Sequence, residues 1–183
     1  MWALVESNSI TKTFNRPKGF TLGDIQYPAS IFTLWSKSEK EAIGIYEIIV
    51  NGSNLKNQDY YINGAESLTW DSSAKTVTKT FASAAAKTLA DLKTAHKTNI
   101  NSQAGSILQS TDWMGIRAAE GGTAMPSDIK TKRAAVRTKA NAMCVQIDGA
   151  SDVDALAALY EYTNTGTEEN PVFTRPLGEF PTI

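Results

Sequence analysis

The residues best suited to chemistry lie in one stretch of the chain, where Asp112 and Trp113 precede three arginines, Arg117, Arg133 and Arg137. An arginine close to an apolar helix face usually forms an ion pair or lays its stem along that face. Asp112 is therefore a candidate partner for Arg133 or Arg137. Tryptophan and arginine also dominate the energetic hot spots of protein interfaces. The simplest interpretation of each of the four tryptophans, Trp113 included, is a position in a core. The functional alternative for Trp113 is an anchor for a partner subunit, and the five residues together indicate a partner-binding site.

Catalytic chemistry has little support in the sequence. Cys144 and His96 are the only cysteine and histidine, and nothing local links them into a nucleophile and base. The chain has no HExxH, glycine-rich phosphate loop, GxSxG or metal-binding cysteine pair. Two carboxylates could converge for glycoside cleavage, but Glu39 and Glu41 are more simply charges at the start of a helix. We therefore expect no enzyme, no catalytic residue, no cofactor and no metal.

The composition is that of an ordinary globular protein. The 183 residues are 42% hydrophobic and 20% charged, which argues against wholesale disorder. A net charge of −1 argues against nucleic acid as the partner, and the basic run from Lys130 to Lys139 is typical of a solvated helix face. No run reaches the ~18 apolar residues of a membrane span, and the start does not resemble a signal peptide. We expect a protein that folds in the cytoplasm without membrane insertion.

Two helices should position the site residues. Ser110, Thr111 and Asp112 are good N-cap types before Trp113, and the glycine pair at 121–122 should end that short helix. Pro126 then restarts the chain as a second helix. The apolar residues on one face of the second helix are Ile129, Val136, Ala140, Met143, Cys144 and Ile147. Arg133 falls inside the same arc and Arg137 at its edge.

A long helix should precede this pair, beginning with Ser83 as its cap and running to Leu108. Its apolar seam is thin and consists of Ala85, Leu89, Leu92, His96, Ile100, Gln103 and Ile107. Such a helix cannot bury its seam alone, so we expect it to pack against other chains. His96 and Gln103 are either solvated or fix the register of a self-associating bundle, as buried polar positions do in coiled coils.

The remaining chain completes an α+β fold. Alternating apolar and polar residues with turn signals predict a small antiparallel β-rich N-terminal domain over residues 1–82, with a helix between Ser36 and Gly44. The connecting helix spans 83–109, and the helical module spans 110–163 with a third helix over 152–162. An extended tail occupies 164–183, where prolines interrupt any helical period.

Both halves of the chain resemble bacteriophage tail proteins. The runs ILQSTDWM, RAAEGGTAMPSDI and RAAVR, which cover roughly residues 104–160, are similar to a C-terminal module of tail-fibre and tail-fibre-assembly proteins. GDIQYPASIFTLWSKSEKEAIGIYEI is similar to segments of the same proteins. The resemblance implies a virion tail component assembled in the host cytoplasm. Its expected partners are other tail or tail-fibre proteins and further copies of the chain, as in trimeric fibres.

Three functions follow as hypotheses. The first is a non-enzymatic structural protein of the phage tail or tail fibre that acts through protein–protein contacts. The second is a tail-fibre assembly chaperone that leaves before the virion matures. The third is a receptor-binding or glycan-binding module that uses the N-terminal sheet.

Overall fold

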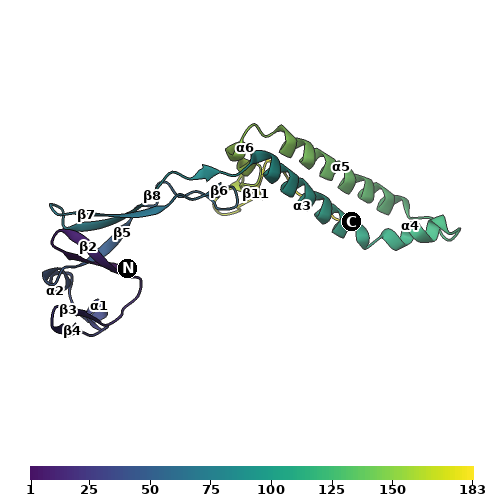
Figure 1. Cartoon of the computed structure of the whole chain (residues 1–183). Helices are drawn as coiled ribbons and strands as arrows, with labels where there is room; N and C mark the ends of the chain where they lie inside the picture. The colour runs from purple at the N-terminus through teal and green to yellow at the C-terminus, as the bar shows by residue number, and fades with distance from the viewer. The chain divides into compact units, whose positions relative to one another are not determined.

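The computed structural model describes residues 1–183 and divides the chain into two units, Met1–Ala85 and Ala86–Ile183. Strands dominate the first unit and helices the second (Figure 1). The α+β class predicted from the sequence is confirmed, with an N-terminal β region followed by a long helix.

The first unit is built on a five-stranded sheet of order β2-β1-β5-β8-β7. Its strands are β1 (Trp2–Glu6), β2 (Ser9–Phe14), β5 (Ile45–Val50), β7 (Glu66–Asp71) and β8 (Thr76–Phe81). Shorter strands are β3 (Phe20–Leu22), β4 (Ile25–Tyr27), β6 (Tyr61–Ile62) and β9 (Ala85–Ala86). Neighbouring strands of the sheet are antiparallel except β5 and β8, which run parallel. A parallel pair requires a long crossover, and the chain between residues 51 and 75 supplies it.

The β1–β2 hairpin is closed by a turn with two left-handed residues. Ser7 and Asn8 have φ of 48° and 65°. Positive φ at both central positions matches the right-handed twist of the flanking strands, which is why such two-residue turns are favoured in hairpins. Strand β1 is an interior strand of the sheet, paired with β2 on one side and β5 on the other.

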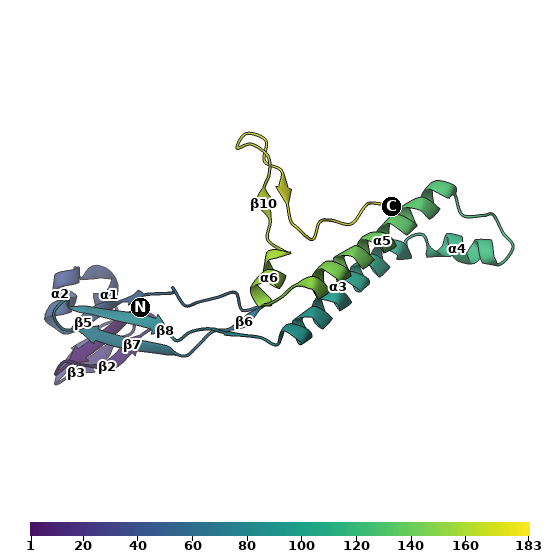
Figure 2. The same cartoon turned by 90° about the horizontal axis from the view of Figure 1, so that it is seen from above.

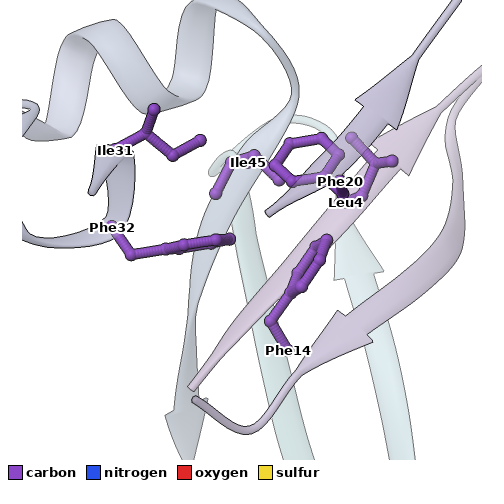
Figure 3. Close-up of a cluster of buried hydrophobic side chains, with 6 residues drawn as sticks. All are labelled: Leu4, Phe14, Phe20, Ile31, Phe32 and Ile45. Carbon is purple, nitrogen blue, oxygen red and sulfur yellow. The ribbon is translucent and has the colours of Figure 1, made fainter. Parts of the chain in front are cut away.

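Strand β1 is buried on both faces because successive side chains point to opposite sides of the sheet. Leu4 faces the larger core, which it shares with Phe14, Phe20, Ile31, Phe32 and Ile45 (Figure 3). The neighbouring residue Ala3 faces a smaller cluster with Ile48 and Val77. Aromatic rings fill the larger core, where the centroid of Phe32 lies 4.9 Å from Trp2 and 5.0 Å from Phe14.

Two short helices, α1 (Ile31–Leu34) and α2 (Lys37–Ala42), connect this core to β5. The predicted capping box of α2 is confirmed. The Glu39 N–H donates to Ser36 Oγ at 3.3 Å, and the Ser36 N–H donates to Glu39 Oε2 at 2.7 Å. Hydrogen bonds from the Ser36 side chain and backbone lower the pKa of Glu39. Gly44 follows the helix with a φ of 78°, as expected of a glycine after a helix end.

The second unit is organised around two long helices. Its helices are α3 (Leu89–Gln109), α4 (Asp112–Ala119), α5 (Ser127–Gly149) and α6 (Val153–Ala158). Helices α3 and α5 lie side by side and antiparallel, with α4 in the connection between them (Figure 2). At one end Lys93 Nζ donates to the carbonyl of Asp148 at 2.8 Å, and at the other Arg133 Nη1 donates to the carbonyl of Leu108 at 2.7 Å.

The start of α3 differs from the prediction, because the helix begins at Leu89 and not after Ser83. Ala85 and Ala86 are exposed and form the short strand β9. Alanine favours helix by at most about 1 kcal/mol per residue, and a turn with nothing to pack against gains little from that preference. Leu89, where the helix begins, has a partly buried side chain, whereas Ala85 and Ala86 do not.

The seam of α3 is partly covered by the protein's own chain. Ile100 is 2% exposed and Ala104 6% exposed, and both lie on the helix that packs against α5. The ring of His96 lies 4.5 Å from that of Tyr160, whereas Gln103 is exposed. The helix therefore gains part of its burial from its own chain, which weakens the argument that it must pack against other chains. The expected homo-oligomer stays a prediction.

The end of the chain also contributes to the second unit. The third helix is shorter than predicted: α6 covers Val153–Ala158, and Asp152 caps it instead of Ser151. Strands β10 (Thr163–Asn164) and β11 (Phe173–Thr174) form a small hairpin in the segment predicted as an extended tail. Beyond it Leu177 is fully buried.

Candidate partner-binding site

The connection between α3 and α5 is held by the guanidinium of Arg133. Its Nη1 donates to the carbonyl of Leu108 at 2.7 Å and to Thr111 Oγ1 at 2.5 Å. Its Nη2 donates to Asp112 Oδ1 at 2.6 Å. One side chain of α5 thus binds the last turn of α3, the corner that follows it and the first residue of α4. We call Leu108, Thr111, Asp112 and Arg133 the arginine clamp.

The clamp satisfies groups that a helix end leaves without partners. The last carbonyls of an α-helix have no intrahelical donor, and they carry the negative end of the helix dipole. A cation at Leu108 meets both needs. The Arg133 side chain is 9% exposed, so its charge is largely withdrawn from water and depends on these three acceptors. Thr111 is also buried and donates its hydroxyl to the Leu108 carbonyl at 3.1 Å.

The sequence prediction for this ion pair is confirmed for one of its two candidates. Asp112 pairs with Arg133. Arg137 lies one turn further along α5, is exposed, and has no part in the clamp. The reason is geometric: Arg133 lies on the same buried stripe as Val136 and Ala140, whereas Arg137 falls just outside it.

Trp113 stands next to the clamp and points away from the core. Its side chain belongs to a residue that is 53% exposed, so the simplest interpretation, a position in a core, is wrong for Trp113. The guanidinium carbon of Arg117 lies 4.9 Å from the centre of the indole ring, which is a cation–π arrangement at helical spacing i, i+4. An α4 of eight residues without a buried side chain has little core to offer an indole.

Ile116 extends the exposed surface beside Trp113. It is 60% exposed and shares the helix face of Trp113 and Arg117, because residues three and four apart are neighbours on a helix. We call Trp113, Ile116 and Arg117 the α4 patch. The sequence pointed to two of its members. Ile116 was missed because the period of an eight-residue helix does not reveal which apolar residues face solvent.

The described side chains include no candidate metal site. No group of three or more histidine, cysteine or carboxylate side chains converges as metal ligands would. One open cavity lies between α2 and β5, beside Lys37, Glu41 and Tyr46. Another lies between the end of α3 and the last four residues of the chain. No helix combines the length and the apolar character needed to cross a bilayer.

Comparisons with models of known protein families, with curated proteins and with solved structures found no match to this chain.

Proposed function

We propose that this chain is a non-enzymatic component of a bacteriophage tail or tail fibre, retained in the virion, that attaches to other tail proteins through its second unit. The proposal combines the resemblance of residues 104–160 to tail-fibre proteins with one structural observation. That observation is the α4 patch, in which the exposed Trp113 and Ile116 lie beside the half-buried Arg117 on a helix whose position is fixed by the arginine clamp.

A fixed, exposed patch of this composition supports a docking role. Monomeric proteins expose scattered apolar residues, but neighbouring large ones beside an arginine are typical of interface hot spots. The clamp matters because a binding helix that is already ordered loses less conformational entropy when a partner arrives. The α4 helix is ordered at its first residue by Asp112 and at the corner before it by Thr111.

The proposal is tested by quantitative mass spectrometry of purified phage particles that carry the wild-type gene or Trp113→Ala. We expect the wild-type chain at the copy number of a tail protein, and loss of the Trp113→Ala chain from particles although it accumulates folded in the cell. Lys132→Ala is the matched control, because Lys132 is exposed and lies outside both the clamp and the patch.

Two other results would replace the proposal. A chain that binds tail proteins in the cell but is absent from particles would be an assembly chaperone. A chain that is absent from particles and binds no tail protein, but binds defined glycans on an array, would be a receptor-binding module.

A further inference from the structure

The Arg117 guanidinium has no acceptor within the chain. Its carbon lies 4.9 Å from the centre of the Trp113 indole ring, and its Nε is buried without a hydrogen-bond partner. Five arginine N–H groups in a fixed fork match a carboxylate well, and an arginine normally finds such an acceptor when part of it is desolvated. In the second unit, Arg133 and Arg175 each have a carboxylate acceptor, from Asp112 and Glu179 respectively.

The backbone around Arg117 keeps the head group against the indole. The Gly122 N–H donates to the Arg117 carbonyl at 3.0 Å, and any Cβ at Gly122 would collide with the stem of Arg117. The chain therefore folds tightly over this stem where α4 ends. Glu120 lies one turn further along the helix but forms no ion pair with Arg117, although i, i+3 spacing permits it.

From these contacts we infer that the α4 patch binds a short linear protein segment in which an acidic side chain stands beside an apolar one. This inference rests on the proposed function and names the chemistry of the partner. The carboxylate pairs with Arg117, which the protein leaves without an acceptor, and the apolar side chain covers Trp113 and Ile116. Charge complementarity with the unpaired guanidinium is what favours an acidic partner.

The size of the patch favours a short segment over a second copy of this chain. Helix α4 has eight residues and is about 12 Å long at a rise of 1.5 Å per residue. A stable complex between folded proteins buries about 800 Å² on each partner. Two α4 helices placed face to face would bury much less, whereas a peptide segment binds through a few anchor side chains.

The test uses the full chain and a displayed library of random linear peptides. We expect selected peptides to share an aspartate or glutamate next to a large apolar residue. Affinity for a selected peptide should fall roughly tenfold or more in Arg117→Gln, because a charge-assisted hydrogen bond is lost. Trp113→Ala should lose binding as well. Lys132→Gln should retain it, because Lys132 is exposed on α5 and belongs to neither the clamp nor the patch. Circular dichroism of each variant checks that the helices are intact.

Three outcomes would overturn the inference: no enriched sequence, enriched peptides without a carboxylate, or equal affinity for wild type and Arg117→Gln. Concentration-dependent self-association that both patch variants abolish would also overturn it, by assigning the patch to a second copy. The proposed function fails separately. If Trp113→Ala is lost from phage particles while Arg117→Gln is retained, the function stands and the acidic partner is wrong. If acidic peptides bind but no tail protein does, the inference about the acidic partner stands and the proposed function is wrong.

Discussion

Arg133 shows how one buried side chain can hold three segments of chain. Its guanidinium is 9% exposed and has three acceptors, whereas its ionic partner Asp112 is 51% exposed. Removal of Arg133 and removal of Asp112 therefore leave different groups without their partner. A bare Asp112 carboxylate can be solvated, but the Leu108 carbonyl and the Thr111 hydroxyl would lose a donor inside the protein.

Replacing Arg133 should accordingly cost much more stability than replacing Asp112. We expect Arg133→Met to lower the free energy of unfolding of the second unit by about 2–3 kcal/mol, because a hydrogen-bonding charge is removed from buried acceptors. Asp112→Asn should cost about 1 kcal/mol or less, since solvent screens a half-exposed pair. Urea denaturation monitored by circular dichroism measures both values.

Arg137→Met supplies the control and should lie within about 0.5 kcal/mol of wild type, as substitutions of exposed residues usually do. A double-mutant cycle on Asp112 and Arg133 isolates the pair itself. A cycle without coupling energy would show that the short contact does not stabilise the protein.

Among the elements, a helix end can be predicted where its capping signals are local and occur together. The spacing of Ser36 and Glu39 and the glycine at 44 located α2 correctly. The start of α3 was misplaced because alanine propensity was not accompanied by packing. In the candidate site, the Asp112–Arg133 pair was predictable from the arc of α5. The acceptor carbonyl of Leu108 was not, because every residue has a carbonyl and only tertiary structure selects one.

The cap of α6 makes one helix sensitive to acid. Asp152 Oδ1 accepts the Ala155 N–H at 2.8 Å, and Oδ2 accepts the Ser151 hydroxyl at 3.0 Å. These bonds, the Ala155 bond first, lower the pKa of Asp152. A folded-state pKa below the unfolded value stabilises the protein above the unfolded pKa, and this contribution is lost as pH falls through the folded pKa.

We therefore expect the first turn of α6 to fray in acid, with the chemical shift of the Ala155 amide titrating at the lowered pKa of Asp152. Asp152→Asn keeps a good N-cap that does not ionise, so its Ala155 amide should be insensitive to pH over the same range. NMR of a labelled chain makes the comparison. An unchanged titration in the asparagine variant would assign the effect to another carboxylate.

Gly44 is required in the first unit for two reasons, its left-handed backbone conformation and the lack of space for a Cβ atom. Its φ is 78°, and a Cβ there would lie 2.5 Å from the carbonyl oxygen of Val5. That carbonyl cannot retreat easily, because the Val5 N–H donates to the Gly44 carbonyl at 2.8 Å. Gly23 offers a matched comparison in the same unit, with a φ of 57° and open space around its Cβ position.

Gly23→Ala should therefore cost about 1–2 kcal/mol for the left-handed backbone alone. Gly44→Ala should cost a further 1–3 kcal/mol, because the methyl group forces the backbone of β1 to move. Denaturation followed by tryptophan fluorescence would give both values. Equal losses of unfolding free energy in the two variants would mean that β1 moves without an energetic cost.

Besides α3 and α5, the second unit has a third layer, to which the last residues of the chain contribute. Helical periodicity in the sequence does not predict this layer. Two packed helices bury one stripe each, and Val136, Met143 and Ile147 on the α5 stripe are fully buried, as is Leu177 near the end of the chain, which adds cover from a further segment. The last residues of the chain contribute to that cover. The Leu177 N–H donates to the Leu159 carbonyl at 3.0 Å, and its carbonyl accepts from Lys139 Nζ at 2.9 Å. Proline-punctuated sequence predicted an extended segment, but not where it would dock.

Leu177 should be the residue on which this docking depends. We expect Leu177→Ala to lower stability by about 2–5 kcal/mol, since a fully buried leucine loses its transfer energy and leaves a cavity. Val172→Ala, in the same segment but at a residue that is 53% exposed, should change it by about 0.5 kcal/mol or less. Hydrogen exchange separates local from global effects, because undocking of the segment alone would remove protection from the Leu177 amide while the amides of α3 and α5 stay protected. If those helices lose protection together with Leu177, the segment is part of the cooperative core. If neither changes, its burial contributes nothing to stability and the third layer must come from α6 alone.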